Sequence, residues 1–271
     1  MDVRHRIHPA LRGLVSRMQG YAFRLDPLAV HHGVPSATAT VIISFDEPLD
    51  VGWQTEPTSR VQRWLLASGL HTTPAMIHTH GTQHGVQLDL TPAGCRALLG
   101  LPIGALTHGL VDHADLPLGI PGDLHARLAD ADWSTRFHHL ERHLLTLVDR
   151  NRSELPADLA RAWRTLAATR GRIRVAELAK DVGWSRRHLV TRFTAEFGLP
   201  PSDLGRLHRF TAAQAYARSG APWVDVAARA GYADQAHLTR EFRALAGQTP
   251  TQWRTEVFPT VQDGQGPNPA G

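Results

Sequence analysis

The chain has 271 residues, of which 42% are hydrophobic and 20% charged, a composition typical of a folded globular protein with one or two domains. No apolar stretch approaches the roughly 20 residues of a membrane span, and residues 1–24 lack the continuous apolar segment of a secretory signal. We therefore expect a cytoplasmic protein without a membrane partner. A single cysteine, Cys95, excludes an internal disulfide and a cysteine-based zinc knuckle.

The basic residues are concentrated in the C-terminal part of the chain. Residues 155–256 contain 16 Arg or Lys against 9 Asp or Glu, a net charge of +7, whereas the remainder contains 13 against 16, a net charge of −3. A basic segment beside a mildly acidic one is expected when only the basic segment meets a polyanion such as DNA.

The first part of the chain alternates short β-branched runs with turn residues, which is typical of strands. Thr91 followed by Pro92 resembles an N-cap with proline in the first turn, so a short helix is expected to about Leu99. The separators between strands are taken as Gly33 to Pro35 and Glu56 to Thr58. The expected strands cover residues 21–25, 39–45, 61–67, 75–80 and 85–90, and residues 101–128 are interpreted as mixed loop and short helix.

Helical periodicity begins near Trp133, where apolar residues at three- and four-residue intervals predict a helix to about Val148 that bridges two domains. The sequence thus predicts an α+β fold, in which a strand-rich, sensor-like N-terminal domain precedes an all-α C-terminal domain with two helix-turn-helix units. The expected boundaries are a strand-rich domain over 1–130, a helical linker over 131–154, the all-α domain over 155–257 and a disordered tail over 258–271.

The all-α domain contains an internal repeat. The segment 175–193 aligns with 223–242, so that Gly183 matches Gly231 and Leu189 matches Leu238, 48 and 49 residues apart. The sequence of each unit predicts a short helix, a glycine turn and a longer helix that ends at a further glycine. This order is the helix-turn-helix pattern. A spacer helix is expected between the units, from Pro201 to Ala217.

The second helix of each unit has one apolar and one polar face. In the first unit Leu189 and Phe193 are expected in the core, while Arg187 and Thr191 project from the opposite side. Two such helices held by a rigid spacer can enter successive major grooves about 34 Å apart.

The run from Ala227 to Arg243, followed by Gly247 to Pro250 and by Trp253-Arg254, resembles the signature of AraC/XylS-type transcription regulators. The first unit resembles that family as well, so the similarity covers about residues 155–256. The segments 85–92 and 95–102 are more weakly similar to the sensor or accessory domains fused to such regulators.

The resemblance implies a set of DNA-contacting positions in the two longer helices. Val190 and Ala236 are apolar and offer only van der Waals contact, for example with thymine methyl groups. The implied residues are Arg186, Arg187, Val190 and Thr191 in the first helix and Gln235, Ala236, His237, Thr239 and Arg240 in the second.

An alternative function is a metal-dependent enzyme domain fused to the DNA-binding module. His78, His80 and His84 are its candidate ligands, because alternate strand residues share a face. No carboxylate follows at close spacing, and in a chain with 17 histidines we favour ordinary surface or core positions. No catalytic residue, metal or cofactor is assigned, and we expect that the protein is not an enzyme.

Cys95 and two tryptophans have functional interpretations that we weigh against structural ones. Cys95 invites comparison with DNA-repair methyltransferase regulators, but a single thiol favours a buried helix cysteine. Trp53 and Trp64 are candidates for the lining of an effector pocket, with a core position the preferred interpretation. The expected function is sequence-specific transcription regulation, with double-stranded DNA, a small-molecule effector, RNA polymerase and a second copy of the chain as candidate partners.

Overall fold

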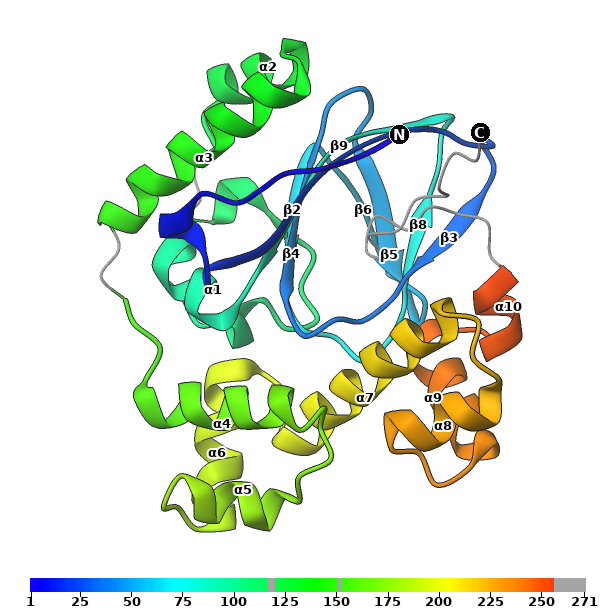
Figure 1. Cartoon of the computed structure of the whole chain (residues 1–271). Coiled ribbons are helices and arrows are strands. Elements are labelled where there is room, and N and C mark those ends of the chain that lie inside the picture. Colours follow the sequence, from blue (N-terminus) through cyan, green and yellow to red (C-terminus); the bar gives the residue numbers. More distant parts are fainter. Residues whose placement is uncertain (117–119, 151–152, 256–271) are drawn as a thin grey trace.

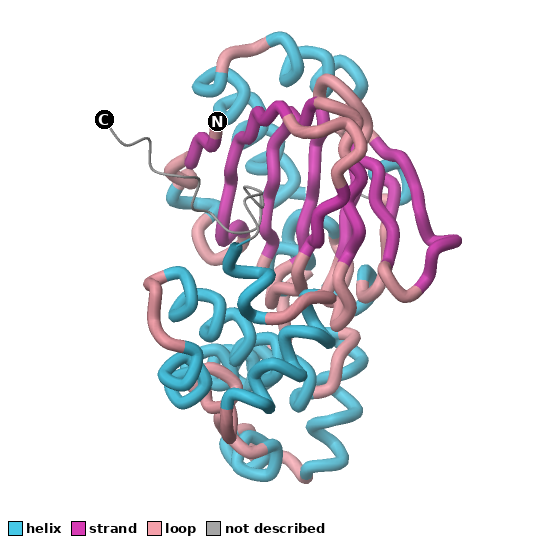
Figure 2. Tube along the Cα trace, turned by 90° about the vertical axis from the view of Figure 1, so that its right-hand side faces the viewer, coloured by secondary structure: helices cyan, strands magenta, loops and turns pink. Residues whose placement is uncertain are grey.

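The computed structural model of the chain describes residues 1–116, 120–150 and 153–255. The tail predicted over 258–271 lies outside these residues. The chain folds into a strand-rich region and a helical region. The helical region lies beyond one end of the strands (Figures 1 and 2). The predicted α+β class, with strands first and helices after, is confirmed.

Two antiparallel sheets form the strand-rich region. The larger has the order β1-β2-β9-β4-β7-β10, and the smaller has the order β3-β8-β5-β6. The strands are β1 (Asp2–Arg4), β2 (Val15–Arg24), β3 (Val30–Gly33), β4 (Ala39–Ser44), β5 (Leu49–Trp53), β6 (Glu56–Arg63), β7 (Leu65–Ser68), β8 (Ala75–His78), β9 (Thr82–Leu90) and β10 (Val111–Asp112).

The larger sheet is covered on both faces, which explains why Val41, Ile42 and Ile43 of β4 are apolar in succession. Val41 and Ile43 of β4 are fully buried in the main core, which includes Leu98 of helix α1 (Pro92–Leu99). Thr40 and Ile42, the alternate residues, line the space toward the smaller sheet. Successive strand residues point to opposite faces, so β4 is buried between a helical layer and a second sheet.

Helices flank the larger sheet on the side away from the smaller one (Figure 1). Helix α1 begins and ends as predicted, because the Thr91 hydroxyl accepts from the Gly94 N–H and Gly100 adopts a left-handed φ of 68°. The other helical elements before residue 151 are the 3-10 turns η1 (Pro9–Leu11), η2 (Ile103–Leu106) and η3 (His113–Asp115) and helices α2 (Gly122–Asp130) and α3 (Trp133–Arg150).

Helix α3 covers the residues expected to form a bridging helix. Its apolar stripe packs onto the strand-rich region, where the Phe137 ring stacks on His5 at 4.6 Å and Glu141 accepts from the His8 N–H. None of the helices within the described ranges is long and apolar enough to cross a membrane.

Two details of the strand prediction are wrong. The strand expected over 61–67 is two strands in different sheets, since β6 ends at Arg63 and β7 begins at Leu65. The chain turns at Trp64, whose side chain is 46% exposed and therefore not in the core. Pro57, taken as a separator, lies within β6, and this is possible because β6 is an edge strand where a missing N–H is tolerated. The turn is instead Gln54-Thr55.

The helical region contains both predicted helix-turn-helix units and the spacer between them. Gly183 and Gly231 at the two turns have φ values of 72° and 84°, which a residue with a side chain adopts only at a cost. The helices are α4 (Ala157–Ala168), α5 (Val175–Asp181), α6 (Arg186–Phe197), α7 (Pro201–Arg218), α8 (Trp223–Ala230), α9 (Gln235–Ala246) and α10 (Pro250–Thr255).

Candidate nucleic-acid interface and intersheet cavity

The N-terminal ends of α6 and α9 are capped in the same way and project polar side chains. Ser185 accepts from the His188 N–H, and Asp234 accepts from the His237 N–H, so each helix begins at a defined residue. The apolar residues on the opposite sides, Leu189 in α6 and Leu238 in α9, are fully buried. Each helix is therefore anchored by its core face and leaves a polar face outside.

The predicted DNA-contacting residues are all at least partly accessible. His237 and Thr239 are half-buried and make local contacts. The His237 ring lies edge-on to Tyr232 at 5.2 Å, and the Thr239 hydroxyl donates to the Gln235 carbonyl. Arg186, Arg187, Thr191, Gln235, Ala236 and Arg240 are exposed, and Val190, His237 and Thr239 are half-buried.

The C-terminal ends of the same two helices lie against the strand-rich region. Gly198 ends α6 beside Thr107, whose hydroxyl donates to the Phe197 carbonyl at 3.3 Å. Gly247 ends α9 beside Gln54, and a Cβ at Gly247 would lie 2.7 Å from the Gln54 Oε1. Both helices that present the polar faces thus end on the other half of the molecule.

A buried ion pair reinforces the contact at α6. Arg96 of α1 donates through Nε and Nη2 to both carboxylate oxygens of Glu196, which is only 6% exposed. The pair raises the pKa of Arg96, and Arg96 also donates to the Ser153 hydroxyl at 3.0 Å. Two parallel hydrogen bonds fix direction as well as distance, so this pair orients α6 relative to α1.

A cavity of about 70 Å³ lies between the two sheets. Most of its lining is apolar, including Ile42, Leu66 and Ile77, and the polar groups include Ser68 and Gln87 of the larger sheet. We call this space the intersheet cavity. It is large enough for several water molecules, since one needs roughly 10–15 Å³ in this measure.

His71 lies at the wall of the intersheet cavity and is 7% exposed. Burial lowers its pKa from 6.5 to about 4, although its Nδ1 contacts the Thr73 carbonyl at 2.6 Å. Only a protonated Nδ1 can donate to that carbonyl, so the neutral ring keeps Nε2 as an acceptor.

Residues 103–110, which we call the connecting segment, contact both the cavity wall and α6. Trp53 lines the cavity and donates through Nε1 to the His108 carbonyl at 3.0 Å, while Leu110 lines the cavity directly. At the other end of the segment Gly104 and Thr107 lie against the end of α6. His108 has a φ of 54°, a costly backbone conformation for a residue with a side chain.

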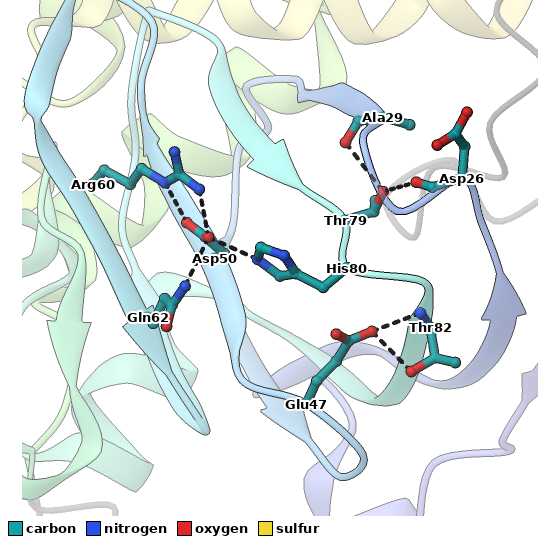
Figure 3. A network of polar contacts seen from close by, with 9 residues as sticks. All are labelled: Asp26, Ala29, Glu47, Asp50, Arg60, Gln62, Thr79, His80 and Thr82. Atoms are coloured by element: carbon teal, nitrogen blue, oxygen red, sulfur yellow. Dashed lines mark hydrogen bonds and ion pairs between the residues drawn. The ribbon is translucent and has the colours of Figure 1, made fainter.

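His78, His80 and His84, considered as metal ligands, line one small pocket, and two of them are held by other partners. His80 donates through Nε2 to the Asp50 carboxylate, which also receives hydrogen bonds from Arg60 and Gln62 (Figure 3). His84 contacts Asp46 through Nδ1 and Arg136 through Nε2, so both its ring nitrogens are engaged. Within the described residues no three His, Cys, Asp or Glu side chains gather as a metal site.

The Asp50 network joins β5, β6 and the turn after β8. Asp50 has no exposed surface, and the hydrogen bonds from Arg60 hold the pKa of its carboxyl well below the usual value, outweighing burial. Nearby, Glu47 accepts from the Thr82 N–H and hydroxyl (Figure 3). These contacts hold the start of β5 to β6 and to the turn between β8 and β9.

The other sequence-based candidates are resolved by their positions. Cys95 is a buried residue of α1, as favoured, and burial raises the pKa of its thiol to about 12. Trp53 is 7% exposed and also lines the intersheet cavity, so the two interpretations both apply to it. Trp64 fits neither interpretation of an internal residue, because it borders an outer groove with Phe45 and His125.

Sequence reasoning did not identify Arg96, Glu196, Thr107 or Gln87. Arg96 and Glu196 are 100 residues apart, and no local pattern links them. Gln87 could have been singled out as a polar residue on a strand whose neighbours Val86 and Leu88 are apolar.

Residues 178–256 match the protein family described as "Helix-turn-helix domain". No curated protein sequence matches the chain. The fold is similar to that of ToxT from Vibrio cholerae, with a TM-score of 0.55, 9% sequence identity and coverage of 88% of this chain and 97% of that chain. ToxT from Vibrio cholerae strain SCE256 with a bound unsaturated fatty acid gives a TM-score of 0.53, 9% identity and coverage of 90% and 96%.

The C-terminal domain of AraT, a response regulator from Geobacillus stearothermophilus, is 22% identical over 38% of this chain and 87% of that one, with a TM-score of 0.36. At these identities the ToxT comparison establishes a shared two-part fold and nothing about ligand or DNA site.

Proposed function

We propose that the helix-turn-helix domain over residues 178–256 is of the AraC type, and that the protein is a transcription regulator that reads one specific DNA site with both α6 and α9. The observation that carries the proposal is the pair of capped helices with buried apolar faces and accessible polar faces. The net charge of +7 over residues 155–256 favours approach to the phosphate backbone.

Arg187 is the proposed base reader of the first unit. It is exposed and lies near the start of α6, the end of a recognition helix that meets base edges. Its planar guanidinium can donate to guanine O6 and N7 together. Arg240 and Gln235 have the corresponding role in α9.

We also propose that the strand-rich region binds a small-molecule effector in the intersheet cavity. The ToxT structure with an unsaturated fatty acid is a precedent for a small-molecule ligand in a protein of this fold. The connecting segment gives the cavity a physical path to α6. An effector changes DNA affinity only if it binds two arrangements of the molecule unequally.

The proposal includes a cytoplasmic location and contacts with RNA polymerase and with a second copy of the chain. Self-association would match the symmetry of many operators. Sedimentation of the full chain with and without operator DNA measures it directly.

The decisive experiment is selection of bound duplexes from a random pool by the full chain at low salt. We expect enrichment of a site with two segments about one helical turn apart, and an affinity that falls steeply with salt. A pool that stays unenriched would overturn the assignment of specific DNA reading.

On the selected site, Arg187→Ala is expected to cost about 1–3 kcal/mol of binding free energy and to relax preference at one base pair. Arg24→Ala is the matched control, because Arg24 is an exposed residue of β2 in the other region. Equal weakening on every sequence would place Arg187 on phosphate instead of a base.

A further inference from the structure

We propose that the ligand of the intersheet cavity is a small uncharged hydroxyl compound, a phenol or an alcohol, whose hydroxyl group donates a hydrogen bond to Gln87. This inference rests on the proposed effector role of the strand-rich region and specifies the chemistry of its ligand. Three features of the cavity carry it: the absence of Asp, Glu, Lys and Arg from its described lining, an amide oxygen without a partner, and a nearby hydroxyl without one.

The described lining of the cavity contains no Asp, Glu, Lys or Arg. Transfer of an ionised group from water into such a site is unfavourable without a counter-charge. The nearest buried carboxylate in the smaller sheet, Asp50, already receives hydrogen bonds from Arg60, Gln62 and His80. A carboxylate ligand, such as a fatty acid, would therefore find no Arg or Lys counter-charge in the described lining, where the titratable groups are His31, His32, His71 and Tyr21.

The orientation of the Gln87 amide determines that the ligand must donate, and Gln87 accept, the hydrogen bond between them. Its side chain is 1% exposed, and its Nε2 donates to the Asp89 Oδ1 at 2.7 Å. This bond fixes the orientation of the amide, because a carboxylate accepts and only the NH₂ group can donate to it. The Oε1 atom is then the remaining polar atom of the amide, and no group of the described residues donates to it. A buried acceptor of this kind is unfavourable by about 1–3 kcal/mol until a donor reaches it.

Ser68 offers a second polar contact on the same face of the sheet. It is 9% exposed, and its hydroxyl has no partner among the described residues. Within the sheet, Ile42 of β4 is paired with Gln87 of β9, and Thr40 of β4 is paired with Ser68 of β7. Gln87 and Ser68 thus flank β4 on either side, and both line the cavity. A ligand hydroxyl can donate to the Gln87 Oε1 and accept from the Ser68 hydroxyl.

The rest of the wall favours an apolar body on the ligand. Trp53 and His71 form an aromatic corner, with ring centroids 4.8 Å apart, and the branched residues Leu49, Val51 and Ile77 continue the surface along the smaller sheet. A compact ring or a short alkyl chain fills such a space without leaving a polar group that lacks a hydrogen-bond partner.

The test is calorimetric titration of the full chain at pH 8 with phenol, benzyl alcohol, toluene, benzoate and benzylamine. We expect phenol or benzyl alcohol to bind, and benzoate and benzylamine, which have similar shapes and a charge, to bind at least tenfold more weakly. Equal or tighter binding of benzoate would overturn the uncharged class.

Gln87→Leu is expected to weaken phenol binding at least tenfold and to leave toluene binding within about twofold, because toluene has no hydroxyl group. Ser68→Ala is a milder second variant that removes only the partner hydroxyl. Thr58→Leu, which changes an exposed residue of β6 outside the cavity, is the control. If phenol and toluene lose affinity equally in Gln87→Leu, the role of Gln87 is structural and the assigned contact is wrong.

Ala75→Leu places added bulk in the cavity and is expected to abolish binding of all neutral ligands. Persistence of phenol binding in this variant would place the site elsewhere and overturn the proposal. DNA selection by the same proteins is a separate readout, so failure of the ligand assignment is distinguishable from failure of the proposed regulatory function.

Discussion

Buried polar side chains of the strand-rich region are held in fixed protonation states by their surroundings. His71 is the clearest example, because burial lowers its pKa to about 4 while the unfolded chain retains a value near 6.5. Between these pH values the unfolded chain binds a proton that the folded protein does not. The contribution of the neutral His71 to the free energy of unfolding is therefore fully present above about pH 6.5 and is lost progressively as the pH falls toward 4.

We therefore expect His71→Asn to lose less stability than the wild-type protein when the pH is lowered from 7.5 to 4.5. The difference is at most about 3 kcal/mol, since each pKa unit is worth about 1.4 kcal/mol. Urea unfolding at both pH values measures it, with the exposed residue His138 of α3 replaced by Asn as the control. His208, whose pKa burial also lowers to about 4, contributes in the same direction in all three proteins. Identical losses in the wild type and His71→Asn would contradict the assignment.

At the scale of elements, the connecting segment is short and tightly enclosed. Gly104 lies against the end of α6, where a Cβ would approach the Gly198 nitrogen to 2.7 Å and the Glu196 carbonyl oxygen to 2.9 Å. Both are backbone atoms of a capped helix end, which cannot move as a flexible side chain can. The packing at this point requires glycine.

Gly104→Ala is expected to push α6 away from η2 and to lower the free energy of unfolding by about 1–3 kcal/mol. Guanidinium unfolding measures this change, and titration with operator DNA measures the accompanying change in affinity. Gly122→Ala is the control, since a Cβ at the start of α2 meets no atom within 4 Å. If the two alanine variants unfold at the same denaturant concentration, the contact between η2 and α6 is looser than described.

At the scale of the whole molecule, both recognition helices end on the strand-rich region, α6 beside Thr107 and α9 beside Gln54. Their N-terminal halves remain accessible. A shift between the two regions therefore changes the direction of both helices at once, and the ion pair between Arg96 and Glu196 resists such a shift.

Glu196→Gln keeps the shape of the side chain and removes its charge. We expect a loss of about 1.5–3 kcal/mol in the free energy of unfolding, because a hydrogen-bonded charge is removed from a largely buried pair. Asp123→Asn, which disrupts the exposed pair with Arg127, is expected to have a much smaller effect. Thermal unfolding of the three proteins compares them, and equal melting temperatures would show that Arg96 finds other partners.

Local signals in the sequence predicted the helices well. Helix α1 begins after Thr91 and ends at Gly100. The glycines at 183, 198, 231 and 247 adopt left-handed conformations at the turns and helix ends of the two units. Such features depend on residues within one turn of each other, so they are visible without knowledge of the fold.

Features that depend on distant residues were not predictable. The break at Trp64 divides one apolar run between two sheets, and only the packing of each half decides which sheet it joins. The partners Arg96 and Glu196 meet across the junction of the two regions, and the cavity is formed by strands spread over more than fifty residues. The DNA-contacting residues remain predictions, placed on accessible faces by the structure.

The edge strand β6 has a consequence for how the protein behaves at high concentration. An open sheet edge is a template onto which another chain can add a strand, the first step toward aggregation. Pro57 removes one N–H from this edge, and the exposed Glu56 and Arg60 place charges of opposite sign along it. Strand addition here would leave a gap in the hydrogen-bond ladder and desolvate both charges. The smaller sheet is thus protected at its β6 edge against growing from one molecule into the next.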